Sequence, residues 1–229
     1  RLNVEVDRGG ATHAMSFSRG APGNFVGGDE SGKFSKQGGL KKSGKPAKKT
    51  ATGTRIKFWA DAQIFTPDAA FDLSEIHARA RQTSYLVPGL KIVVTDKRLK
   101  SEQTSEFVHV GGISEFCEFL SEGESVSPVI RLKGSGKFHE TVPVLDDEGH
   151  MTPQNVEREL GVDIALLWNN TYDTQLQSYV NIISTPKGGT HVTGFDRAIV
   201  KTVNEQLKAQ RLLKAGEDSI TKEDVQEGM

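Results

Sequence analysis

Hydrophobic and polar residues alternate near the start of the chain. The alternation runs from Leu2 to Val6, stops at a turn-forming segment at 8–10, and returns from His13 to Phe17. A period of two residues is typical of strands, so this segment predicts a β-hairpin. A third alternating segment, 55–59, predicts a strand that pairs with the hairpin.

A helix is predicted to begin after Asp72. Asp72 and Glu75 have the D-x-x-E spacing of a capping box, in which the aspartate accepts a hydrogen bond from a free amide of the first turn. Apolar residues on one face of this helix are Leu73, Ile76 and Ala80. Pro88 ends the helix, and alternation over 90–94 predicts the next strand.

The second half of the chain contains two more predicted amphipathic helices. In the first, Ile113, Phe116, Cys117 and Leu120 repeat with helical spacing, which directs Cys117 towards the core. In the second, the repeating residues are Phe195, Ile199, Val203 and Leu207. Between these helices, the segments 162–168 and 179–183 predict strands.

Two polar segments divide the chain. Residues 20–52 are rich in Gly, Ser and Lys and have only isolated apolar residues, so we expect a mobile loop. The range 31–60 holds nine Lys and Arg residues and no acidic residue. Residues 96–106 are polar apart from Leu99, and we place a domain boundary there, between residues 1–104 and 105–229.

Charge balance and cysteine content narrow the class of protein. The chain of 229 residues has 29 Lys and Arg against 30 Asp and Glu, a net charge of −1, which excludes the basic bias of a nucleic-acid coat protein. The single cysteine, Cys117, cannot form an internal disulfide, which favours a cytoplasmic location. No apolar run approaches the ~20 residues needed to cross a bilayer. We expect a piece of a longer polypeptide, because the chain opens on Arg1 in a strand-like pattern.

Candidate chemistry is sparse in the composition and spacing. Residues 27–33 read G-x-x-x-x-G-K, but Phe34 stands where a phosphate-binding loop has a magnesium-binding hydroxyl, and no strand–helix context surrounds the segment. The six histidines lack the close pairings typical of metal ligands, so we expect no metal site. The lysine-rich segment 31–57 leaves two interpretations open: contact with DNA phosphates, or a solubilising loop.

Three stretches together resemble the B subunit of the bacterial type IIA topoisomerases, DNA gyrase and topoisomerase IV. Residues 52–59, TGTRIKFW, are similar to the family's G-T-x-x-x-F-W strand near the nucleotide. Residues 188–195, GGTHVTGF, match G-G-T-H-x-x-G-F, and residues 223–229, EDVQEGM, are close to E-D-x-R-E-G-L. Their order and spacing extend the resemblance over most of the chain.

The resemblance implies an α+β fold in two parts. Residues 1–104 are expected to form the C-terminal part of a GHKL-type ATP-binding α/β sandwich, the fold shared with Hsp90, MutL and histidine kinases. Residues 105–229 are expected to form a transducer domain with a left-handed βαβ crossover, an exception to the usual handedness, truncated before the lysine loop that meets the γ-phosphate.

The resemblance also implies an activity and partners. The parent protein is expected to be the ATP-hydrolysing part of a DNA topoisomerase that uses ATP and Mg²⁺. Its expected partners are DNA, the A subunit of the topoisomerase and a second B subunit, in an A2B2 assembly without a membrane partner. The expected location is the cytoplasm, in association with the nucleoid.

The resemblance assigns few site residues to this chain. Gly53, Thr54 and Ile56 are expected to form one wall of the adenine pocket, and Arg8 to lie at the pocket mouth that aminocoumarin inhibitors contact. The simpler interpretations are that Thr54 is only a β-forming residue and that Arg8 only begins a turn. No catalytic residue or metal ligand is expected within the chain, so the isolated chain is predicted to be inactive.

The length of one segment bears on the choice between the two enzymes. The segment 140–161 is longer than its counterpart in typical gyrase B chains, which favours topoisomerase IV over DNA gyrase. A stand-alone interaction module of the same fold is the competing class of function. Supercoiling and decatenation are not distinguished by these residues.

Overall fold

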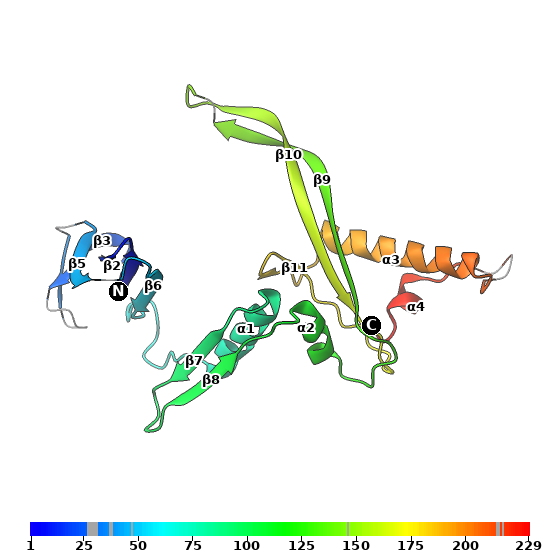
Figure 1. The fold of residues 1–229 in the computed structure, drawn as a ribbon, viewed down its shortest axis with the longest axis horizontal. Helices are drawn as coiled ribbons and strands as arrows, with labels where there is room; N and C mark the ends of the chain where they lie inside the picture. Colours follow the sequence, from blue (N-terminus) through cyan, green and yellow to red (C-terminus); the bar gives the residue numbers. More distant parts are fainter. Residues whose placement is uncertain (27–31, 37–38, 47, 146, 214–215, 217) are drawn as a thin grey trace. The chain divides into compact units, whose positions relative to one another are not determined.

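The chain divides into two compact units, Arg1–Phe71 and Asp72–Met229, and each is described by itself. The computed structural model describes residues 1–26, 32–36, 39–46, 48–145, 147–213, 216 and 218–229, without the side chains of 43–46. Figure 1 follows the elements along the chain. Most of the glycine-rich segment 27–33 lies outside the described residues.

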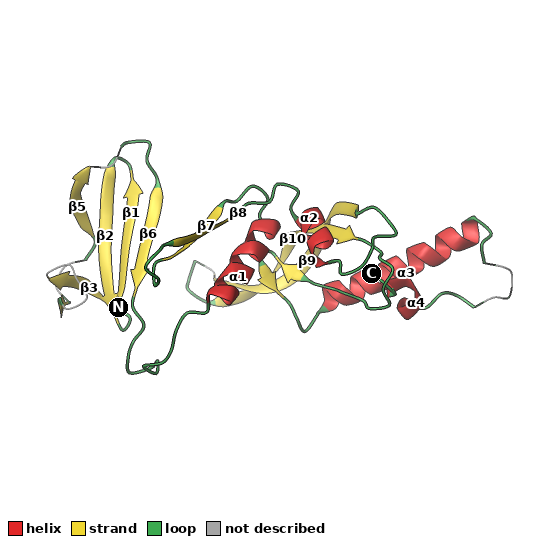
Figure 2. Cartoon of the chain, turned by 90° about the horizontal axis from the view of Figure 1, so that it is seen from below, coloured by secondary structure: helices red, strands yellow, loops and turns green. Residues whose placement is uncertain are grey.

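The first unit is built on an antiparallel sheet with strand order β4-β3-β2-β1-β6, in which β5 also pairs with β2. Its strands are β1 (Leu2–Arg8), β2 (Ala11–Ser18), β3 (Ala21–Val26), β4 (Lys33–Ser35), β5 (Lys41–Pro46) and β6 (Gly53–Phe58). The β1–β2 hairpin pairs without interruption, and β6 lies antiparallel to β1 on the other side (Figure 2). The predicted hairpin and the predicted pairing strand are both confirmed.

Three strands occupy the segment 20–52, where the composition predicts a loop. Strand β3 pairs with β2, β4 pairs with β3, and β5 pairs with β2. The rings of Phe25 and Phe34 meet across the β3–β4 pair, with centroids 5.0 Å apart. A cross-strand aromatic pair stabilises a sheet even where other apolar residues are few, and counting isolated residues along the sequence does not detect it. The expectation of a segment without strands is therefore wrong, while its mobility stays a prediction.

The second unit opens with α1 (Leu73–Leu86), which begins where the sequence predicts. The Asp72 carboxylate accepts hydrogen bonds from the backbone N–H of Ser74 at 2.8 Å and from its hydroxyl at 2.6 Å. Strands β7 (Ile92–Asp96) and β8 (Gln103–Phe107) then form an antiparallel hairpin. The boundary expected at 104/105 falls inside β8, whereas the compact units separate after Phe71. The assignment of separate functions on either side of residue 104 stays a prediction.

Aromatic residues form a core between α1 and α2 (Ile113–Leu120). The buried ring of Tyr85 stacks on that of Phe116, with centroids 4.9 Å apart, and on that of His109, with centroids 3.6 Å apart. Ser84 is fully buried beside them, with Oγ 2.7 Å from Nδ1 of His109. Phe116 is the buried residue of α2; Cys117 is half-buried, and this burial raises the pKa of its thiol.

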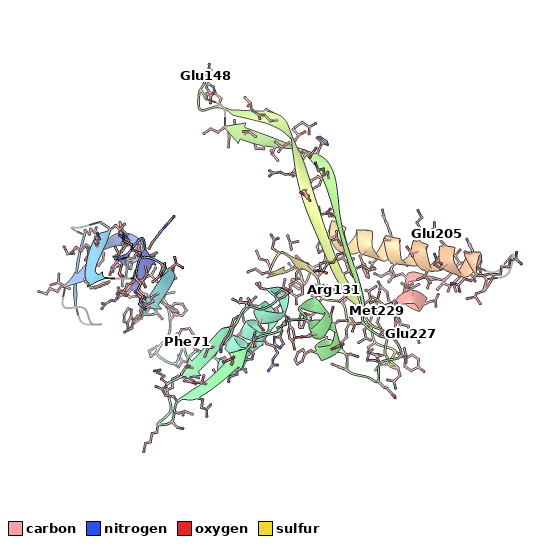
Figure 3. The ribbon with its side chains drawn as sticks, in the orientation of Figure 1. Phe71, Arg131, Glu148, Glu205, Glu227 and Met229 are labelled. Carbon is pink, nitrogen blue, oxygen red and sulfur yellow. The ribbon has the colours of Figure 1, made fainter. Side chains whose placement is uncertain are left out.

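A long hairpin follows α2. Strands β9 (Ile130–Leu145) and β10 (Met151–Leu166) pair over their full 16 residues, with Glu148 at the turn and Arg131 near the base (Figure 3). The segment 140–161 therefore forms the turn and the outer part of both strands. One face carries ion pairs, including Arg131 to Asp163 at 2.8 Å. The other carries apolar residues, among them Leu132, Phe138, Leu160 and Val162, together with the ion pair of Arg158 and Glu140.

The remaining elements are β11 (Tyr179–Val180), β12 (Ile183–Ser184), α3 (Thr190–Ala209) and α4 (Lys222–Gln226). The long helix predicted from its apolar repeat over 195–207 is confirmed as α3, and Figure 1 shows α4 near it. All strand pairs among the described residues are antiparallel. The left-handed βαβ crossover, which requires parallel strands, therefore stays a prediction.

Candidate functional site: one face of the N-terminal sheet

The expected pocket residues lie on β6 and at the end of β1. Thr54 of β6 pairs with Val6 of β1, and Ile56 pairs with Val4. Because side chains alternate across a strand, Thr54 and Ile56 share one face of the sheet with the even-numbered residues of β1, which include Arg8. The structure thus brings Thr54, Ile56 and Arg8 to the same face. Gly53, which pairs with Asp7, lies at the start of β6.

The opposite face of the same strands is polar and holds their register. The Arg55 guanidinium donates to Asp7 at 2.7 Å and to Glu5 at 2.9 Å, and so joins β6 to β1. The buried Thr12 on β2 donates its hydroxyl proton to Asp7 at 2.6 Å. These bonds, first from Arg55 and then from Thr12, hold the pKa of the Asp7 carboxyl below its usual value, and the carboxylates raise the pKa of Arg55.

The face that carries Thr54 is open. All six residues of β6 are exposed, and Ile56 has 64% of its surface accessible. Within the described residues, the Thr54 hydroxyl makes no hydrogen bond, so it is free to bind a water or a ligand. A free hydroxyl beside an exposed apolar side chain fits one wall of an adenine pocket.

A hollow lies at the opposite end of this face. It measures about 910 Å³ and is lined by aromatic residues from β2, β6 and the segment after β6, among them Phe17, Phe58, Trp59 and Phe65. Arg19 and Asp61 border it and form an ion pair at 2.7 Å. Neither Thr54, Ile56 nor Arg8 lines this hollow, so the expected pocket wall is not enclosed by the described residues.

The described residues do not form a metal centre. Among them, no group of three or more His, Cys, Asp or Glu side chains is arranged to hold a metal ion. The nearest carboxylates to Thr54 along the sheet, those of Asp7 and Glu5, point to the other face and are bound by Arg55. The described residues therefore do not fit a Mg²⁺ site. No helix among them is long and apolar enough to span a membrane.

The stretch 223–229 is joined to the residue that follows the stretch 188–195. That residue, Asp196, accepts from Lys222 at 2.7 Å and from the Gln226 side-chain amide at 2.8 Å. Burial raises the pKa of Asp196, but these two hydrogen bonds outweigh that effect and hold it below its usual value. At the position where the family pattern has arginine, Gln226 thus makes a side-chain hydrogen bond to Asp196.

The last residues also dock on the segment that follows β10. The Trp168 indole N–H donates to the Val225 carbonyl at 2.9 Å, and the Asn169 amide donates to the Gly228 carbonyl at 2.7 Å. Thr174 donates its hydroxyl proton to the Gln226 carbonyl at 2.6 Å. Val225, Gln226 and Gly228 are buried in this contact. The motif 223–229 is therefore a structural clasp between α3 and the 168–175 segment, which we name the C-terminal clasp.

Comparison with known proteins gives consistent matches. The family model for DNA gyrase B matches residues 112–229. The DNA gyrase B chain of Streptococcus pyogenes serotype M1 is 33% identical over the whole chain, and that of Halalkalibacterium halodurans is 31% identical over the whole chain. The chain spans 30% of the length of these relatives.

Solved structures agree with the sequence matches. The 43K ATPase domain of Thermus thermophilus gyrase B, solved in complex with an aminocoumarin, has a TM-score of 0.68 at 30% identity and is matched over 99% of this chain and 52% of that one. The B subunit of Myxococcus xanthus DNA gyrase has a TM-score of 0.59 at 22% identity, over 90% of this chain and 50% of that one.

The fold is therefore that of gyrase B ATPase domains, the GHKL-type α+β fold that the resemblance implies. The chain belongs to the DNA gyrase B family of type IIA topoisomerase B subunits. This assignment does not separate gyrase from topoisomerase IV, so the preference for topoisomerase IV is not confirmed.

Sequence reasoning misses two side chains that organise these regions. Arg55 stands out in the sequence only as part of an alternating strand, although a basic residue opposite Glu5 and Asp7 would be the signal for a cross-strand ion pair. Asp196 lies within α3, yet it accepts hydrogen bonds from Lys222 and Gln226, which are 26 and 30 residues further along the chain. Contacts at such separations have no local sequence signal.

Proposed function

We propose that the chain is part of the ATP-binding and transducer region of a type IIA topoisomerase B subunit, which couples ATP binding and hydrolysis to DNA strand passage. The observation that carries the proposal is the match to gyrase B over the whole chain, with 33% identity and a shared fold. Since the chain spans 30% of its relatives, the activity is proposed for the longer protein.

Within that protein, we assign residues 1–104 to the ATP-binding domain and residues 105–229 to the transducer. Gly53, Thr54 and Ile56 form one wall of the adenine pocket, with the Thr54 hydroxyl binding the base through water. Arg8 lies at the pocket mouth, where an aminocoumarin would contact its guanidinium. Support comes from the shared sheet face of Thr54, Ile56 and Arg8, and from the aminocoumarin complex of the Thermus thermophilus domain.

The partners follow from the same proposal. ATP and Mg²⁺ are the cofactors, with the metal ligands supplied from outside the described residues. DNA and the A subunit of the topoisomerase are the macromolecular partners, in an A2B2 assembly that dimerises through its B subunits when ATP binds. The cytoplasm, in association with the nucleoid, is the location where these partners are found.

The adenine wall is tested in the longer protein with Thr54→Val. This substitution keeps the β-branched shape and removes the hydroxyl, so we expect ATP binding to weaken by about fivefold, the value of one net hydrogen bond of about 1 kcal/mol. Thr202→Val on the exposed side of α3 is the matched control and should leave the affinity unchanged. Equal affinities for the two variants would remove Thr54 from the pocket. A longer protein that binds DNA but neither binds ATP nor passes strands would favour the interaction-module alternative.

The longer protein is the B subunit of either topoisomerase IV or gyrase under this proposal. Different observations favour each enzyme. The relatives at 31–33% identity are gyrase B subunits. The β9–β10 hairpin, extended by the segment 140–161, is the feature that favours topoisomerase IV. Reconstitution of the longer protein with its A subunit decides between them. Negative supercoiling of relaxed plasmid would establish gyrase, and decatenation without supercoiling would establish topoisomerase IV.

A further inference from the structure

The two compact units carry opposite charge. Residues 1–71 contain twelve Lys and Arg and six Asp and Glu, a formal net charge of +6, and residues 72–229 contain 17 and 24, a net charge of −7. The overall charge of −1 therefore conceals a strongly basic first unit. Such a distribution creates a local positive potential that attracts a polyanion.

Much of the positive charge of the first unit lies on and beside its terminal strands. Lys33 belongs to β4 and Lys36 directly follows it; Lys41 and Lys42 belong to β5. Among the described residues, strand β4 pairs only with β3, and β5 pairs only with β2. Both lie on the side of β2 that faces away from β6. We name the exposed lysines of this region the basic edge; they are Lys33, Lys36, Lys41, Lys42, Lys48 and Lys49.

The charges of the basic edge are not neutralised within the described part of the unit. No ion pair joins any of its six lysines to a described carboxylate. Three acids in the described part of the unit have other partners: Glu5 and Asp7 bind Arg55, and Asp61 binds Arg19. Among the described residues, the six ammonium groups thus have no carboxylate partner and can bind an external anion.

The edge is held in place by packing. Phe34 of β4 meets Phe25 of β3, and Gly23 lies so close that a Cβ there would be 2.3 Å from the Ser35 carbonyl oxygen. On β5, Lys41 pairs with Ala14 and Lys42 with His13. Successive residues of a strand point to opposite faces, so Lys41 and Lys42 place charge on both sides of the edge.

We propose that the basic edge binds the phosphate backbone of duplex DNA, as a contact separate from the nucleotide-facing strand β6. The number of lysines and their lack of carboxylate partners within the described residues suit sequence-independent phosphate contacts. The choice of DNA as the polyanion rests on the proposed function. Lysines on edge strands also prevent sheets from pairing edge to edge, but that role does not involve DNA.

The test measures binding of the 229-residue chain to a fluorescent duplex of about 25 bp as salt rises from about 50 to 200 mM. The edge variant changes Lys33, Lys36, Lys41 and Lys42 to Gln. The control variant changes four exposed lysines of the second unit to Gln: Lys100, Lys187, Lys201 and Lys208. A third variant changes the four edge lysines to Arg, which keeps the charge.

We expect the edge variant to bind DNA at least tenfold more weakly at the lowest salt. The plot of log affinity against log salt concentration should also become shallower, by about 0.9 for each lysine removed and so by up to about 3.6 for the four. The control and arginine variants should bind within twofold of the original chain. Light scattering would show whether the edge variant is still monomeric, and a loss confined to aggregated protein would overturn the proposal.

Three other results would also overturn the proposal. The first is that the original chain does not bind DNA, and the second is that the edge and control variants lose DNA affinity equally. The third is that polyglutamate competes as effectively as unlabelled duplex of equal charge, a result that would favour an acidic protein partner. Strand passage by the longer protein is measured separately. If the longer protein passes strands but the basic edge does not bind DNA, only the inference about the basic edge is contradicted. If the longer protein does not pass strands, the proposed function is contradicted, while DNA binding by the basic edge is still judged by its own measurement.

Discussion

Arg55 and Thr54 are adjacent in β6, and their side chains lie on opposite faces of the sheet. Arg55 ties β6 to β1 through Asp7 and Glu5, and because side chains alternate, this bond directs Thr54 to the open face. A shift of register by one residue would exchange the two faces. The sequence predicts the strand and its alternation, but the partner of Arg55 depends on residues about fifty positions earlier, which local pattern does not reveal.

The Arg55 contact predicts a sensitivity to acid. A carboxyl whose pKa is lowered by folding stabilises the fold above its ordinary pKa, near 3.8, and that contribution is lost as the pH falls through the lowered value. Arg55→Gln removes the largest cause of the shift, so an NMR titration should show the Asp7 midpoint moving up towards 3.8. Arg19→Gln, which removes a partner of Asp61, should leave the Asp7 midpoint in place; an unchanged midpoint in Arg55→Gln would contradict the assignment.

Elements with strong periodicity are predictable and elements held by distant contacts are not. The hairpin 2–17 and the helices α1, α2 and α3 follow from apolar spacing and a capping residue. Strands β3, β4 and β5 escape prediction because they are held by pairing with other strands and by cross-strand contacts such as that of Phe25 with Phe34, which the local pattern does not show. The proposed pocket wall rests on resemblance to the family, and the strand register shows that its residues Thr54 and Ile56 share one face of the sheet.

At the level of elements, the C-terminal clasp depends on Gly228. This residue has φ of +70°, and a Cβ on it would lie 2.6 Å from the Asn169 carbonyl oxygen and 2.7 Å from that of Thr171. Gly228→Ala should therefore detach the clasp, with a cost of about 1–3 kcal/mol. The Asn169 amide, which donates to Gly228, should then exchange its hydrogen faster by roughly tenfold to a hundredfold.

The clasp has a matched control in Gly149, at the β9–β10 turn. It also has a positive φ, +85°, but nothing lies within 4 Å of a Cβ placed there. Gly149→Ala should leave exchange at Asn169 unchanged, so acceleration by both variants would mean that Gly228 acts through general destabilisation.

For the whole molecule, the described residues hold no metal centre, and the proposed function gives the chain only one wall of a nucleotide site. Phosphoryl transfer depends on positioned metal ions and cationic groups around the γ-phosphate, and one wall leaves most of the ligand in water. Calorimetric titration of the isolated chain with a non-hydrolysable ATP analogue should show no micromolar binding, and no ATP turnover should be measurable. The longer protein, as the control, should bind the analogue and dimerise; turnover by the isolated chain would contradict this prediction.

The register of the N-terminal sheet has a kinetic consequence. Strands β1 and β2 are joined by two residues, whereas 44 residues separate the end of β1 from the start of β6. Closing a longer loop costs more chain entropy, so the hairpin is expected to form early in folding and β6 to join it late. The repelling lysines of the intervening segment extend the chain and slow that closure further. Thr54 and Ile56 would then reach their places only in the last step of sheet assembly, and added salt, by screening the lysines, should accelerate that step.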